Sequence, residues 1–119
     1  MLKTITIASF AALAAAATLA LPTLAAPAAQ TVRVTESDYR IGLSTRPRAG
    51  RVTFVVRNAG EDAHDFVVRG GGRTWRTRTL GVGSTARLTA QLRRGVRYQY
   101  WCAVGSHAKK GMRGSFVAR

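Results

Sequence analysis

The feature that most restricts the fold of this chain is a series of short runs in which apolar and polar residues alternate. The run 51–58 places Val52, Phe54 and Val56 on one face, and the run 84–92 alternates in the same way. Side chains of a β-strand point to opposite faces with period two, so each run predicts a half-buried strand. Short runs of this kind, separated by glycine-rich breaks, are typical of an all-β sandwich or barrel.

The remaining runs complete a set of seven or eight predicted strands within one domain. They comprise a run around Val32 and Val34, a run through Tyr39, Ile41 and Leu43, and the runs 64–69, 73–79, 96–102 and 113–118. Residues 45–50 form a predicted turn, because Pro47 has no N–H to donate and is disfavoured inside a central strand. Alternation in the run 96–102 predicts that Tyr98, Tyr100 and Cys102 share one face and that Trp101 points away from it. The sequence contains neither heptads nor an internal repeat.

The first 28 residues differ from the rest and predict a secretory signal peptide. Lys3 precedes an apolar stretch at 5–21, and Ala26-Pro27-Ala28 fits a small-residue cleavage site. We therefore expect a mature domain spanning 29–119, located in the periplasm or secreted. The alternative is an uncleaved membrane anchor, since the apolar stretch is close to the minimum length that spans a bilayer.

The chain is strongly basic, with 19 basic and 5 acidic residues and a formal charge of +14. Such a charge attracts an acidic protein, an anionic membrane surface or nucleic acid. Its arginines are dispersed from Arg33 to Arg119, and no nucleic-acid motif accompanies them. The competing interpretation is a solvated β surface that happens to be rich in arginine.

The candidate site begins with Cys102, the only cysteine of the chain, which is followed by His107 and Met112 in a glycine-containing loop. An exported protein with one cysteine cannot form an internal disulfide, and coordination to a metal would protect the thiol. Thiolate, imidazole and thioether donors suit copper, whereas calcium and magnesium prefer oxygen. A His₂Cys site with a weak axial Met needs a second histidine, and the chain has one more, His64.

Each of these residues also has an ordinary structural interpretation. A lone cysteine at a strand end is usually a small buried apolar residue. A lone histidine is more often a hydrogen-bonded polar residue than a ligand, and a methionine can fill a core. The metal interpretation depends on their combination, which uses the one cysteine and both histidines of the chain.

Two blocks of the sequence, 58–68 around His64 and 95–117 around Cys102, resemble the cupredoxins, the type 1 blue copper proteins, and especially small bacterial plastocyanin- and azurin-like members. The resemblance covers nearly all of the mature chain and implies a Greek-key β-sandwich of seven to eight strands. It also implies one type 1 copper ion with four ligands: His64, Cys102, His107 and Met112. In this family the histidine at the position of His107 has an edge that reaches solvent.

Three positions add detail to the resemblance. Ser106 stands where the family often has Gly. Asp65 follows His64, where Asn is common, and we expect it to accept a hydrogen bond from the cysteine loop and so support the ligands. Trp101 is either a route for electrons to the surface or ordinary apolar cover for the strand.

The function implied is that of an exported carrier of single electrons, which is not an enzyme. We expect a monomer whose acidic redox partner docks near Lys109, Lys110 and Arg113, with an anionic membrane surface as a further partner and no specific nucleic acid. The alternatives are a periplasmic copper-binding or delivery protein with the same ligands and a basic polyanion-binding β domain. A Cys/His hydrolase has little support, because no orienting third group other than Asp65 is evident. Copper enzymes of related fold need a second cysteine or additional histidines.

Overall fold

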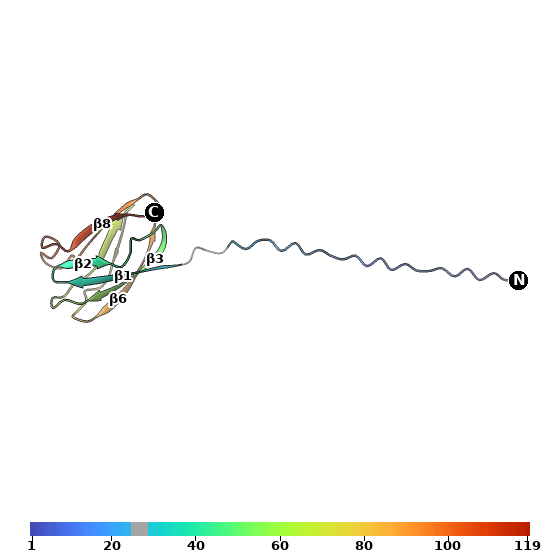
Figure 1. Ribbon diagram of the computed structural model, residues 1–119, viewed down its shortest axis with the longest axis horizontal. Helices are drawn as coiled ribbons and strands as arrows, with labels where there is room; N and C mark the ends of the chain where they lie inside the picture. The colour runs from blue at the N-terminus through green and yellow to red at the C-terminus, as the bar shows by residue number, and fades with distance from the viewer. Residues whose placement is uncertain (25–28) are drawn as a thin grey trace.

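The computed structural model describes residues 1–24 and 29–119 (Figure 1). Residues 1–24 form neither a helix nor a strand. Nowhere in these two ranges is there a helix of the length and apolarity that a membrane crossing would need. The predicted cleavage motif Ala26-Pro27-Ala28 lies outside the described residues, so cleavage after Ala28 stays a prediction.

The domain is all-β, as predicted, with eight strands in two four-stranded sheets. One sheet has the order β2-β1-β3-β6 and the other β5-β4-β7-β8. The strands are β1 (Gln30–Ser37), β2 (Arg40–Leu43), β3 (Gly50–Asn58), β4 (Val67–Gly70), β5 (Arg73–Arg76), β6 (Thr85–Leu92), β7 (Arg97–Trp101) and β8 (Arg113–Val117). The chain passes between the sheets after β3, β5 and β6, which gives a Greek-key sandwich.

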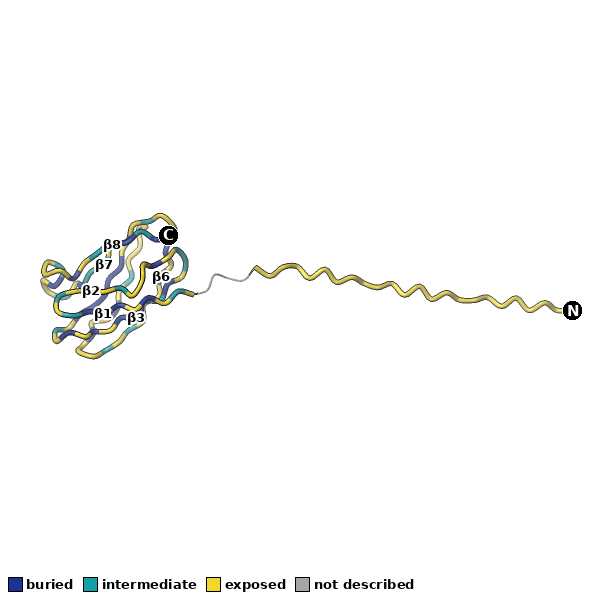
Figure 2. Tube along the Cα trace, in the orientation of Figure 1, coloured by how far each residue is buried: buried dark blue, intermediate teal, exposed yellow. Residues whose placement is uncertain are grey.

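The register of the first sheet follows from its alternating sequence. β1 runs parallel to β3 and pairs Val32 with Phe54, while β3 runs antiparallel to β6 and pairs Val52 with Ala90. These four side chains are 1% exposed or less, whereas their chain neighbours turn outward (Figure 2). Burial of this apolar face supplies the main driving force for the fold.

Aromatic side chains from the second sheet fill the other half of the core. Tyr98 and Phe116 stack with ring centroids 5.6 Å apart, and Phe54 meets Phe66 across the sandwich at 5.3 Å. The faces of β7 are those expected, because Tyr98 and Cys102 are buried while Gln99 is exposed. Cys102 thus leaves the end of β7 pointing into the sandwich.

Three positional predictions were wrong, the first being the end of the run 73–79, since β5 stops at Arg76. His64 does not belong to a strand: it forms an isolated bridge with Leu80, and β4 begins three residues later at Val67. The reason is that residues 59–66, hereafter the crossing segment, carry the chain from one sheet to the other. Tyr39 is likewise outside a strand, in the turn between β1 and β2, because the hairpin closes with Ser37 paired to Arg40.

Candidate metal centre

Three buried side chains from distant parts of the sequence converge at one end of the sandwich. Cys102 Sγ lies 3.8 Å from His64 Nδ1 and 3.7 Å from His107 Nδ1, and the two Nδ1 atoms are 3.1 Å apart. The crossing segment supplies His64, while Cys102 and His107 come from the loop 102–112 between β7 and β8, hereafter the ligand loop. The structure therefore brings together three of the four predicted ligands in a cluster able to hold a metal ion.

Backbone hydrogen bonds fix the shape of the ligand loop. Cys102 N–H donates to Met112 O at 3.1 Å and closes the loop, and Met112 N–H donates to His107 O at 3.1 Å. Between them, Lys110 N–H reaches Ser106 O at 3.2 Å, which forms a turn of helical type. The loop bends at Gly105 and Gly111, whose φ values of 48° and 126° are disfavoured for residues with a side chain.

Met112 is placed by the same hydrogen bonds. Its side chain is 0% exposed, and its backbone is hydrogen-bonded to the backbones of both Cys102 and His107. It therefore lies at the base of the ligand loop, and its role as the axial ligand stays a prediction.

A carboxylate lies on the outer side of each imidazole ring, opposite the Nδ1 atom that faces the cysteine. His64 Nε2 lies 2.6 Å from Asp38 Oδ1, and His107 Nε2 lies 3.6 Å from Asp62 Oδ2. The Asp38 carboxylate accepts a hydrogen bond from His64, so the tautomer assigned to His64 carries its proton on Nε2. Asp62 is too far from His107 for a hydrogen bond, and its negative charge favours the same tautomer there. The lone pairs of both Nδ1 atoms then point toward Cys102.

This donor set fits a metal ion. Among the described residues, the polar neighbours of each Nδ1 atom are the other Nδ1 and the Cys102 sulfur. Two lone pairs at 3.1 Å repel unless a proton or a cation lies between them. An ion held in a trigonal plane, with bonds of about 2.0 Å to nitrogen and about 2.3 Å to sulfur, spaces its nitrogens about 3.5 Å apart and its sulfur about 3.7 Å from each. The observed spacings are close to these values.

The environment of the Cys102 sulfur suits a buried metal thiolate. Burial raises the pKa of the Cys102 thiol, while the backbone N–H groups of Asp65 and Val104 lower that pKa in part. Without a cation the thiol keeps its proton at neutral pH, and a bound metal ion would displace it.

Asp65 connects the crossing segment to the ligand loop. Its Oδ1 accepts a hydrogen bond of 2.6 Å from Ala103 N–H, which is the contact expected from the sequence. Its Oδ2 accepts from Arg76 Nε at 3.1 Å and from a terminal Arg76 nitrogen at 2.6 Å. The carboxylate is fully buried, so these three donors compensate its charge.

Trp101, adjacent to the thiolate position, lies half-buried on the outer face of the second sheet. The guanidinium carbon of Arg69 lies 5.2 Å from the centre of its ring. An open groove of about 500 Å³ runs beside it, lined also by Gln99, Ala108 and Arg113. The electron route predicted through Trp101 therefore ends in a surface groove bordered by arginine.

Sequence reasoning did not identify Tyr39 and Asp62, which cover His107. The Tyr39 ring lies 4.9 Å from the His107 ring, and its hydroxyl donates to Asp62 Oδ2 at 2.6 Å. His107 is only 8% exposed as a result, so the edge expected to reach solvent is mostly covered.

Asp38 was missed for a different reason, since it lies in a turn that carries no motif. The sequence held one indication of a role for Asp38, which is the clustering of acidic residues. All five acidic residues of this very basic chain fall between Glu36 and Asp65. The backbone N–H of Glu61 is the main cause that lowers the pKa of Asp38, and the hydrogen bond from His64 adds to it. Asp38 is therefore a carboxylate at neutral pH.

Comparison with known proteins supports the fold. No protein-family model matches the chain, and no curated protein matches it. Among solved structures, auracyanin B superposes with a TM-score of 0.65 at 18% identity, covering 81% of this chain and 92% of that one. The dithionite-reduced auracyanin of the photosynthetic bacterium Roseiflexus castenholzii gives 0.60 at 16% identity, with coverage of 80% and 99%.

At these identities the superpositions establish the fold. The chain has the fold of the auracyanins, which are cupredoxins, as the sequence resemblance implied. Within that fold, its His-Cys-His cluster has the composition and spacing of a type 1 copper site.

Proposed function

We propose that this protein is an exported type 1 copper protein that carries single electrons by cycling between Cu(II) and Cu(I). The observation that supports this proposal best is the convergence of two imidazole Nδ1 atoms and one sulfur in a buried cluster on a rigid β-sandwich. One of the similar structures is that of an auracyanin reduced with dithionite, which is in keeping with a redox role for this fold. No substrate turnover is part of this proposal.

Copper, when bound, would supply the redox couple, and the chain would supply a site that changes little between oxidation states. His64, Cys102 and His107 would hold the ion, with Met112 as the weak axial ligand. The crossing segment fixes His64 through hydrogen bonds with Leu80 of 3.1 and 2.6 Å, and Asp65 ties that segment to Ala103. Ligands held from both sides of the site need little rearrangement during electron transfer.

The buried ligands favour a retained cofactor over a delivered one. His64 and Cys102 are 0% exposed and His107 is 8% exposed, so an acceptor has little access to the ion. Export through residues 1–28, to the periplasm or beyond, is part of the same proposal and agrees with the apolar stretch 5–21.

The experiment that tests this function is visible absorption of the mature domain, 29–119, after addition of Cu(II). We expect an intense blue or green thiolate charge-transfer band that is lost in Cys102→Ser and bleached reversibly by a reductant. A colourless wild-type protein would contradict the proposal. A coloured protein that cycles slowly and passes Cu(I) readily to a chelator would favour copper delivery instead.

The proposed partner is an acidic redox protein that docks near Lys109, Lys110 and Arg113. Both lysines are exposed on the ligand loop, and Arg113 borders the groove beside Trp101. Asp38 and Asp62 lie at the same end, and Lys110 Nζ is 4.3 Å from the centre of the Tyr39 ring, whose hydroxyl donates to Asp62. Positive and negative groups are therefore neighbours on this part of the surface. We therefore expect an acidic partner to dock on the side that carries Arg113 and the groove beside Trp101.

Inorganic probes of opposite charge test this surface without a known partner. Electron transfer to ferricyanide, an anion, should slow as salt increases and should slow further in Lys109→Glu. Transfer to the cation tris(phenanthroline)cobalt(III) should show the opposite dependence. Equal salt dependence for both probes would contradict steering by positive charge.

A further inference from the structure

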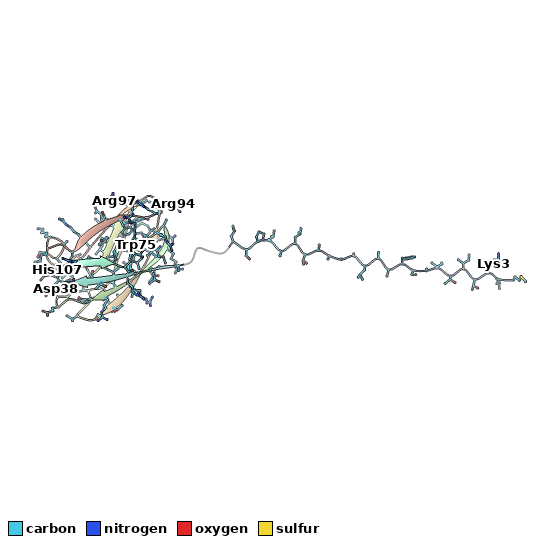
Figure 3. All side chains as sticks on the ribbon, in the orientation of Figure 1. Lys3, Asp38, Trp75, Arg94, Arg97 and His107 are labelled. Carbon is cyan, nitrogen blue, oxygen red and sulfur yellow. The ribbon has the colours of Figure 1, made fainter. Side chains whose placement is uncertain are left out.

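We propose that Asp38 is a positioning residue for the metal, which holds the His64 ring through Nε2 and thereby favours Cu(II) over Cu(I). The inference rests on the proposed function and concerns a residue outside the predicted ligand set. Asp38 lies in the turn between β1 and β2, 26 residues before His64. Figure 3 shows Asp38 and His107 at the same end of the sandwich.

Asp38 and His64 form a short, well-shielded pair. Asp38 Oδ1 and His64 Nε2 are 2.6 Å apart, the distance of a strong charge-assisted hydrogen bond. His64 is 0% exposed, so the bond is shielded on the imidazole side. With its proton held on Nε2, the ring can offer only Nδ1 to a metal.

The Asp38 carboxylate is itself fixed in place by backbone N–H groups. Asp38 Oδ2 accepts a hydrogen bond of 2.9 Å from Glu61 N–H, and the Asp62 N–H lies 3.3 Å from Oδ1 and 3.4 Å from Oδ2. Both amides belong to the crossing segment that carries His64. The turn, the carboxylate and the ligand therefore form one connected unit.

Gly60 lies directly against the Asp38–His64 pair. A Cβ atom added at this position would overlap Asp38 Oδ1 and lie 3.0 Å from His64 Nε2. Neither atom could yield without lengthening the hydrogen bond between them. The absence of a side chain at position 60 thus leaves the room that the Asp38–His64 pair occupies.

The two histidines are not held equally. Asp62 Oδ2 lies 3.6 Å from His107 Nε2, beyond hydrogen-bonding distance, and it already accepts the Tyr39 hydroxyl at 2.6 Å. The direct carboxylate contact is therefore specific to His64. A carboxylate acceptor increases the basicity of the opposite ring nitrogen, which stabilises the ion of higher charge more than the ion of lower charge.

The experiment compares Asp38→Asn with wild type and with Glu61→Gln. The matched control removes one nearby negative charge but keeps the Glu61 N–H that binds Asp38. We measure Cu(II) and Cu(I) affinities by chelator competition and the reduction potential by spectroelectrochemistry. Asp38→Asn should lower Cu(II) affinity by about 10- to 100-fold, lower Cu(I) affinity less, and raise the potential, while Glu61→Gln should change each only slightly. Gly60→Ala should resemble Asp38→Asn.

The readouts separate this role from a merely structural one. A variant that only loosens the fold would weaken both oxidation states equally and leave the potential unchanged, which would overturn the inference. Unchanged affinities in Asp38→Asn would also overturn it. If the wild-type protein formed no thiolate band with Cu(II), the proposed function would fail. The Co(II) affinities of wild type and the same variants would still test whether Asp38 positions His64 for a metal.

Discussion

The carboxyl group of Glu36 is buried near the metal centre and has no hydrogen-bond donor among the described residues. It is 0% exposed on β1, and among the described residues neither of its oxygens has a hydrogen-bond partner. Burial, together with the negative charge of Asp65, raises the pKa of Glu36 from 4.5 to about 8. The folded protein therefore keeps a proton here that the unfolded chain releases at lower pH.

This predicts that the free energy of unfolding of the metal-free protein falls as pH rises from about 5 to 8, because the unfolded state then binds fewer protons. At about 1.4 kcal/mol per pKa unit, the rise from 4.5 to about 8 makes the contribution of Glu36 about 5 kcal/mol. Glu36→Gln should remove this contribution and make the variant more stable than wild type at pH 8. Urea unfolding at a series of pH values measures it, and parallel profiles for the two proteins would contradict it.

At the scale of elements, Asp65 joins three segments that the sequence keeps apart. Its carboxylate links the crossing segment to Ala103 in the ligand loop and to Arg76 on β5. The Ala103 contact lies beside the metal cluster, whereas the Arg76 side chain is 56% exposed. Loss of the Ala103 contact should therefore disturb the metal centre, whereas loss of the Arg76 contact should not.

We predict that Asp65→Ala destabilises the domain by about 2 kcal/mol through loss of a charge-assisted hydrogen bond. It should also shift the visible band and the reduction potential, because the loop that carries Cys102 loses its anchor. Arg76→Gln is the matched control: it removes two of the three donors to the buried carboxylate and should also destabilise the domain, by about 3 kcal/mol. Because it keeps the Ala103 contact, it should leave the visible band and the potential nearly unchanged. A spectrum and potential unchanged in Asp65→Ala would show that this carboxylate does not support the copper site.

For the whole molecule, the distribution of charge is uneven. The acidic residues Asp38, Asp62 and Asp65 contact the ligand-bearing segments, whereas arginines cover both sheets and their connections. Figure 3 shows Arg94 and Arg97 away from the end that carries His107. A bound cation would reduce both the repulsion among these carboxylates and the repulsion between the two Nδ1 atoms.

Copper should therefore stabilise the whole domain. A ligand at a thousand times its dissociation constant adds about 4 kcal/mol to the free energy of unfolding, which in a domain of this size raises Tm by about 15 °C or more. Differential scanning calorimetry with and without Cu(II) measures the shift, which a chelator should reverse. Cys102→Ser should show a much smaller shift, and an equal shift in that variant would place the copper elsewhere.

The sequence by itself determined the sandwich and the principal donors. Alternation in 51–58 and 84–92 decides which side chains face inward, since a strand has a fixed period of two. The donors could be named because the chain has one cysteine and two histidines, and a soft donor set limits the metal.

Only the tertiary structure decided how those donors are held. Asp38 meets His64 across 26 residues, and Tyr39 covers His107 from a turn that the alternating pattern had assigned to a strand. His64 itself lies in a crossing between sheets, where its backbone pairs with Leu80 alone. Contacts of this kind depend on which turns meet at one end of the sandwich, and no local periodicity encodes that meeting.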